Sequence, residues 1–234
     1  MAEAVGDSVA VALQEDGDMQ SLAEKFLTEN ERQAVTAAVR QAEKRTSGEI
    51  VPMVVSASHH YPLAAAAGAT MLSLPLALLL TSALGSALWL GSRDMYLFLA
   101  FFALLYFPMR AAVNRSVMLK RLFLGRNQIE EEVEEAAITS FFSEGLYRTR
   151  EENGILIFVS VLEQRVWVLG DRGINEKIEP TAWQDIVRDL TAGIKAGRQG
   201  DALCQAVTRV GEILSTHFPQ RNDDRDELHN LIIR

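Results

Sequence analysis

Residues 61–109 decide the fold of this chain, and they read YPLAAAAGATMLSLPLALLLTSALGSALWLGSRDMYLFLAFFALLYFPM. The only charged residues within them are Arg93 and Asp94, which lie between two apolar runs. The first run, Tyr61–Gly91, exceeds the roughly 20 residues that a helix needs to cross ~30 Å of hydrocarbon. It therefore predicts a membrane-spanning helix.

The second apolar run, Met95–Met109, is short for a span. It is long enough to span if residues 111–113 belong to the same helix and the Arg110 side chain snorkels to the membrane interface. We therefore predict a two-helix transmembrane hairpin over residues 61–113. One span followed by an interfacial or buried helix is the alternative.

The charges beside the hairpin predict its orientation. Five basic residues follow the second run with no acid among them: Arg110, Arg115, Lys120, Arg121 and Arg126. Basic residues near helix ends favour the cytoplasmic side, so both soluble flanks are expected in the cytoplasm of a two-span protein in the cell membrane.

Two further features agree with a cytoplasmic location. The single cysteine fits a reducing compartment. The acidic N-terminal residues lack the pattern of a secretory signal.

The net charge of -8 argues against nucleic acid as a partner, because the only basic block lies beside the predicted membrane segment. The lipid bilayer is the expected partner instead.

The predicted organisation of the chain has five parts. They are a disordered acidic tail (1–20), one discontinuous domain (21–60 with 127–218), the hairpin (61–113), a basic juxtamembrane segment (114–126) and a polar C-terminal tail (219–234).

Helix and strand signals flank the hairpin. Thr28 and Glu31 form a capping box that opens a helix over about 29–44. Residues 50–55 have the apolar run of a buried strand, although Pro52 favours an edge. The later elements predicted are a helix over 127–145 with Phe141 and Phe142 on its apolar face, strands over 155–160 and 165–169, a helix from Pro180, and a helix over 203–214.

This order predicts an α/β fold interrupted by the hairpin. A strand, a crossover helix and a second strand give a parallel pair, with helices covering the sheet faces. The short connection at 161–164 makes the second and third strands antiparallel. The sheet is therefore expected to be small and mixed.

The topology predicts that acids meet at one sheet edge. The starts of the first two strands should lie beside the end of the third. The residues placed there are Glu49, Glu151, Glu152, Asn153, Asp171 and Glu176. Carboxylate and amide oxygens are the ligands of calcium or magnesium, so these six are the candidate metal ligands. Turns are also rich in such residues for conformational reasons alone, which is the structural alternative.

Other catalytic signatures are missing from the sequence. Cys204 and Arg209 are one residue too close for the C-x5-R loop of cysteine phosphatases, and both lie in a helical pattern. There is no phosphate-binding G-x4-G-K-[ST], no G-x-S-x-G and no H-E-x-x-H. No catalytic residue is assigned, and whether the chain is an enzyme stays open.

Four segments, taken in order, resemble the TPM-domain family, also described as thylakoid-phosphatase-like. They are Leu27–Glu31, Ala42–Ile50, Asn153–Ser160 and Val166–Ile174. The resemblance implies a three-layer α/β/α sandwich, calcium binding in some members, acid-phosphatase-type activity in others, and roles in assembly or maintenance of membrane complexes.

The resemblance also bears on the candidate metal ligands. The family's acidic loop resembles Glu151, Glu152 and Asn153, and the acid after its glycine turn resembles Glu176. This chain departs from the family pattern at Arg172, which places a positive charge near any cation.

Two functions follow from these observations. The first is a membrane-tethered cytoplasmic TPM-like module that binds a membrane-protein partner in complex assembly or maintenance. The alternative is a divalent-metal-assisted phosphatase that uses the acidic cluster at the sheet edge.

Overall fold

The computed structural model describes residues 22–59, 61–88, 94–220 and 228–234. The predicted acidic tail 1–20, His60, Arg93 and residues 221–227 of the predicted polar tail lie outside these ranges. The chain forms two compact units. The α/β unit comprises Met1–His59 and Glu130–Arg234, and the helical unit comprises His60–Ile129.

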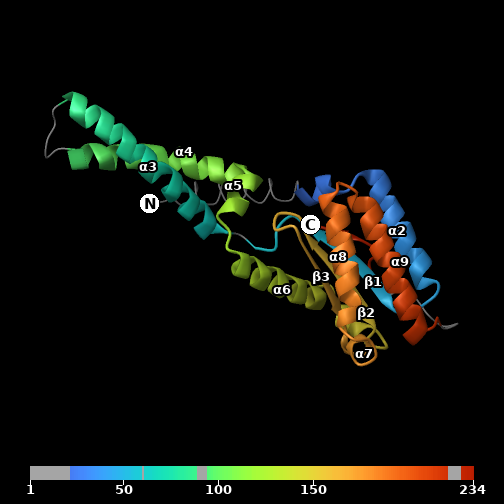
Figure 1. Ribbon diagram of the computed structural model, residues 1–234. Helices are drawn as coiled ribbons and strands as arrows, with labels where there is room; N and C mark the ends of the chain where they lie inside the picture. Colours follow the sequence, from blue (N-terminus) through green and yellow to red (C-terminus); the bar gives the residue numbers. More distant parts are fainter. Residues whose placement is uncertain (1–21, 60, 89–93, 221–227) are drawn as a thin grey trace, which may run out of the picture. The chain divides into compact units, whose positions relative to one another are not determined.

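A four-stranded sheet with the order β3-β2-β1-β4 lies at the centre of the α/β unit (Figure 1). The strands are β1 (Glu49–Val55), β2 (Gly154–Ser160), β3 (Arg165–Gly170) and β4 (Ile232–Ile233). Strand β1 pairs parallel with β2, and β2 pairs antiparallel with β3. The small mixed sheet predicted from the sequence is confirmed.

Pro52 lies within β1, opposite Ile157 of β2. On its other side β1 pairs with β4 only at Met53 and Val54. The backbone at Pro52 thus has one neighbouring strand, and the missing N–H of proline is tolerated there as it is on an edge strand.

The sequence did not predict strand β4. Its two residues lie at the end of a polar segment and are too few to show a strand pattern. They are held by backbone hydrogen bonds in which Arg234 N–H donates to Val54 O (2.9 Å) and Ser56 N–H donates to Arg234 O (2.7 Å). The C-terminal end of the chain therefore extends the sheet beside β1.

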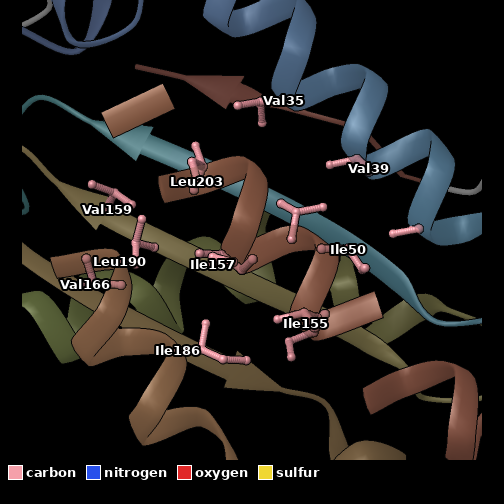
Figure 2. Packing of buried hydrophobic residues seen from close by; sticks show 14 of the residues in the cluster. Val35, Val39, Ile50, Ile155, Ile157, Val159, Val166, Ile186, Leu190 and Leu203 are labelled. Atoms are coloured by element: carbon pink, nitrogen blue, oxygen red, sulfur yellow. The ribbon is translucent and has the colours of Figure 1, made fainter. Parts of the chain in front are cut away.

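One face of the sheet is covered by α2 (Glu29–Glu43), α8 (Thr181–Lys195) and α9 (Gln199–His217), as Figure 1 shows. Helix α2 begins with the predicted capping box of Thr28 and Glu31. Figure 2 shows the core between these layers. Its labelled members are Val35, Val39, Ile50, Ile155, Ile157, Val159, Val166, Ile186, Leu190 and Leu203.

The opposite face of the sheet is also buried, because side chains alternate along a strand. Met53, Leu156 and Phe158 are at most 2% exposed. Helix α6 (Arg126–Ser143) contributes the buried side chains of Val133, Ala137 and Phe141. The α/β unit is therefore an α/β/α sandwich with three layers.

The helical unit contains α3 (Pro62–Leu88), α4 (Asp94–Arg115) and the short α5 (Val117–Leu122). Helices α3 and α4 pack against each other. Two segments, Leu63–Leu84 and Asp94–Arg115, are long and apolar enough to cross a membrane.

The packing of α3 inverts the pattern of a water-soluble helix. Its buried residues are all small, and four of them recur every four positions: Ala65, Ala69, Ser73 and Ala77. Its exposed residues are large and apolar, with Leu63, Met71 and Leu79 each at least 68% exposed. Small residues let backbones approach closely, and large apolar residues outside them suit a lipid environment.

Candidate functional site

The fold brings the predicted acidic residues to one edge of the sheet. Glu49 at the start of β1 lies opposite Gly154 at the start of β2. Gly170 at the end of β3 lies opposite Ile155. The two strand starts and the strand end therefore meet, as the topology predicted. We call Glu49, Glu151, Glu152, Asn153, Asp171 and Glu176 the acidic edge.

Asn153 joins the starts of β1 and β2. Its side-chain amide donates to the backbone oxygen of Ser47, and its backbone oxygen accepts from Glu49 N–H (3.2 Å). Its own N–H donates to Thr149 Oγ1 (3.0 Å). Asn153 is 2% exposed and Glu49 is 6% exposed, so this part of the edge is a buried polar junction that holds the strands in register.

The turn before Asn153 packs closely on the segment that follows β3. Ser47 Oγ donates to Glu151 Oε2 (3.2 Å), and Gly173 N–H donates to the backbone oxygen of Glu152 (3.0 Å). A Cβ at Gly173 would lie 2.7 Å and 2.8 Å from the carbonyl oxygens of Glu151 and Glu152. Glycine is therefore required at 173 for this close approach.

Arg172 lies between two of the candidate ligands. Its Nε is 3.0 Å from Glu152 Oε2 and 3.3 Å from Glu176 Oε1. The guanidinium side chain is 74% exposed, so these ion pairs add little stability. They do place the protein's own cation between two carboxylates of the acidic edge.

Asp171 is the N-cap of the short helix α7 (Arg172–Asn175). Its Oδ1 accepts from Arg172 N–H (2.7 Å), whereas its Oδ2 is buried without a hydrogen-bond partner among the described residues. Burial raises the pKa of Asp171, and the negative charge of Glu152 adds to this, against the opposing hydrogen bond and charge of Arg172. Burial thus disfavours the charged form of the Asp171 carboxyl.

The described residues contain no group of three or more His, Cys, Asp or Glu side chains arranged to hold a metal ion. Asn153 is used in the strand junction, and Arg172 pairs with Glu152 and Glu176. A divalent cation at this edge would have to displace Arg172 from Glu152 and Glu176. Calcium or magnesium binding stays a prediction.

A second feature of the α/β unit is an exposed apolar surface that the sequence did not predict. Phe141 and Phe142 were both assigned to the apolar face of their helix, but Phe141 is 4% exposed and Phe142 is 58% exposed. Adjacent helical residues point about 100° apart, so both cannot face the sheet. That assignment was wrong for Phe142.

Phe142 forms this surface with residues from the same helix and from the following turn η2 (Leu146–Arg148). The rings of Phe142 and Tyr147 are 5.5 Å apart, and the Arg148 guanidinium is 5.3 Å from the Tyr147 ring. Ile138 lies one helical turn before Phe142 and is 39% exposed. We call Ile138, Phe142, Tyr147 and Arg148 the aromatic surface.

A family model described as the TPM domain matches residues 116–213, which include α6, β2, β3 and α8. The chain contains a TPM domain. The match begins after the hairpin, and the fold shows that α2 and β1, from before the hairpin, complete the same sandwich. The family resemblance drawn from the sequence is therefore confirmed.

The TPM domain also has a structural relative. The NMR structure of BA42 protein from the psychrophilic bacterium Bizionia argentinensis matches with a TM-score of 0.53 and 22% sequence identity. The match covers 88% of this chain and 94% of that one. At this identity the likeness concerns the fold alone. No curated protein matches the chain.

Proposed function

We propose that this chain is a membrane-tethered module whose TPM domain binds a protein partner in the assembly or maintenance of a membrane complex. The aromatic surface carries the proposal. In the described part of the α/β unit, the exposed large hydrophobic side chains are Ile138, Phe142 and Tyr147, and all three belong to it. Apolar side chains gathered at one place on a soluble surface are typical of an interaction site.

The chemistry of this surface supports a protein partner. Aromatic residues and arginine are enriched in protein interfaces and provide much of their binding energy. Phe142 and Tyr147 contact each other, and Arg148 stacks on Tyr147, so the side chains are ordered before a partner arrives. Such order lowers the entropy lost on binding.

The helical unit supports the membrane tether. Only 6% of the apolar stretch of α4 that could cross a membrane is buried. The core helix of a soluble protein is mostly buried instead. Thr70 Oγ1 donates to Ala66 O (2.9 Å) within α3, so this hydroxyl is satisfied without water. The basic residues after α4 favour a cytoplasmic location for both flanks of the hairpin.

A site-specific crosslinking experiment tests the partner proposal. A photo-crosslinking residue at 142 in the full chain, in native membranes, should give one reproducible adduct. The same residue at Thr139, which is exposed on the same helix, serves as the control. Tyr147→Ala should reduce the adduct from 142 at least about fivefold, because aromatic anchors each provide ~1–2 kcal/mol. Equal adducts from 142 and 139, or no effect of Tyr147→Ala, would contradict the proposal.

A metal-assisted phosphatase is the second candidate, and one observation favours it. The buried Asp171 Oδ2 has no hydrogen-bond partner among the described residues and lies at an edge that other acids share. The test is hydrolysis of a generic phosphomonoester by the purified full chain with magnesium, manganese or calcium. Turnover that survives both Asp171→Asn and Glu152→Gln would remove this candidate.

A further inference from the structure

The α/β unit contains a cavity at the sheet edge opposite the acidic edge. It is a cavity of about 300 Å³ bounded by residues 22–26, the end of β2, the start of β3, the last turn of α8 and the first residue of α9. We call it the basic pocket. The lining residues used below are Lys25, Phe26, Arg165, Thr191, Ile194 and Lys195.

All the charged residues that line the basic pocket are positively charged. Its lining includes three cations, Lys25, Arg165 and Lys195, and no Asp or Glu. Arg165 Nη2 is 3.1 Å from Glu130 Oε1. Among the described residues no carboxylate lies within 4 Å of Lys25 Nζ or Lys195 Nζ. Two ammonium groups therefore face a shared cavity without an acidic partner.

The neighbouring acid Glu163 is already engaged. Its carboxylate accepts from the hydroxyl of Ser160 and from Ser58 N–H (3.0 Å), and it is 5% exposed. It is therefore held at the strand end, and it is not among the residues that line the pocket. An anion entering the cavity would meet Lys25 and Lys195, which form no ion pair among the described residues.

The rest of the lining is apolar or neutral. Phe26, Val166 and Ile194 provide apolar surface, and Thr191 and Gln199 provide neutral hydrogen-bonding groups. A cavity of this volume is at the lower end of the range for small-molecule sites. The lining suits a compact anionic group that is attached to an apolar body.

The position of the pocket indicates which anion can reach it. In open α/β sheets, ligands bind beyond the carboxyl ends of parallel strands, and β1 and β2 end at this edge. The chain leaves the same edge after Val55 and begins α3 at Pro62. Residues 56–61 can span at most about 22 Å. If α3 enters a bilayer, lipid headgroups are within reach of the pocket.

We propose that the basic pocket binds the phosphate headgroup of an anionic phospholipid, with Lys25 and Lys195 as the principal contacts. This inference rests on the membrane tether of the proposed function. Anionic lipids attract basic groups near the membrane surface, and each such group adds measurable affinity. Phe26 and Ile194 would contact the glycerol and the start of the acyl chains.

Reconstitution of the full chain in nanodiscs of phosphatidylcholine with one tenth phosphatidylglycerol tests the proposal. Native mass spectrometry after mild delipidation measures the phosphatidylglycerol retained. Lys25→Gln with Lys195→Gln should lower retention at least about tenfold. Arg40→Gln with Lys44→Gln removes the same charge from the exposed side of α2 and should leave retention within twofold. Equal losses in the two pairs would overturn the proposal.

A second variant separates shape from charge. Thr191→Trp fills the cavity without changing the net charge and should also abolish selective retention. Retention unchanged in both Thr191→Trp and the lysine pair would overturn the proposal.

Two further measurements distinguish the sources of the anion and the cause of a failure. Inorganic phosphate at millimolar concentration should not displace the lipid, and displacement would indicate a site for a free anion instead. Alkaline extraction of the same membranes reports the tether separately. A chain that resists extraction but retains no phosphatidylglycerol would overturn the pocket and leave the proposed function standing.

Discussion

At the scale of single residues, Glu31 links two helices. Its carboxylate accepts from Thr28 N–H (2.8 Å) and from the Thr28 hydroxyl (2.7 Å), which closes the capping box of α2. These hydrogen bonds lower the pKa of Glu31, and a further one from Gly200 N–H contributes. A Cβ at Gly200 would lie 2.6 Å from Glu31 Oε1. The same side chain thus caps α2 and the start of α9.

Replacing Glu31 should destabilise the chain in a pH-dependent way. We expect Glu31→Ala to lower the stability by ~1 kcal/mol at pH 7, as the loss of a helix cap does. Because the folded pKa lies below the ordinary value of 4.5, the contribution is complete above pH 4.5 and is lost as pH falls through the folded pKa. Thermal unfolding of both chains at pH 7 and pH 3.5 measures this.

Glu135→Ala is the matched control for Glu31, because Glu135 is exposed on α6. It should leave the unfolding temperature nearly unchanged at both pH values. A loss in Glu31→Ala that is the same at pH 7 and pH 3.5 would mean that the side chain acts by packing and not through its charge.

Arg172 provides the residue-scale test of the acidic edge. Arg172→Gln removes the charge that pairs with Glu152 and Glu176. If the edge is a cation site, calcium or magnesium affinity measured by calorimetry should rise about tenfold, because a competing cation is gone. The control is Arg188→Gln, which removes an exposed charge paired with Asp185 on α8. No cation binding in either variant would count against metal chemistry at this edge.

The sequence predicted where the candidate site lies in the fold, but it did not predict which side chains contact each other there. Strand order alone brings Glu49, Asn153 and Asp171 to one edge, and the register confirms this. Whether a carboxylate pairs with Arg172 or stays available depends on side-chain rotamers and on the left-handed backbone of Glu152 (φ 52°). Neither leaves a signal in the spacing of residues.

At the scale of elements, long periodic segments were predictable and short ones were not. The capping box and the apolar period predicted a helix over 29–44, and α2 covers Glu29–Glu43. The two-residue strand β4 has no period of its own. It forms because β1 leaves an unpaired edge at Val54 and Ser56, and a sheet edge can bind any nearby extended segment.

Removal of residues 231–234 tests the contribution of β4. The truncation deletes the hydrogen bonds from Arg234 N–H to Val54 O and from Ser56 N–H to Arg234 O, and the ion pair of Arg234 Nη2 with Glu144 Oε1 (2.7 Å). We expect a loss of ~1–3 kcal/mol and faster hydrogen exchange at Ser56 N–H.

The single substitution Arg234→Gln distinguishes the contribution of the ion pair with Glu144 from that of the backbone pairing of β4. It keeps the backbone bonds of β4, so exchange at Ser56 N–H should stay slow. Fast exchange in Arg234→Gln would mean that the ion pair with Glu144, and not strand pairing, holds the end of the chain.

At the scale of the whole molecule, the sheet limits how the chain can cross a membrane. Strand β1 precedes α3 and α4 in the sequence, and β2 follows them, yet the two strands pair along their full length from Glu49 to Val55. A sheet cannot form across a bilayer, because unpaired backbone groups are too costly in hydrocarbon. The number of spans between β1 and β2 must therefore be even.

This parity predicts the accessibility of cysteine reporters. In a Cys204→Ser background, Gln33→Cys before the hairpin and Gln184→Cys after it should show the same accessibility to an impermeant maleimide. With the orientation proposed from the basic residues after α4, both should react only when the cytoplasmic face is open. Both positions are exposed, on α2 and on α8 of the same sandwich. Labelling of intact and of opened cells measures this. Reaction of one reporter in intact cells and of the other only after opening would require an odd number of spans, which the parallel pairing of β1 with β2 does not allow.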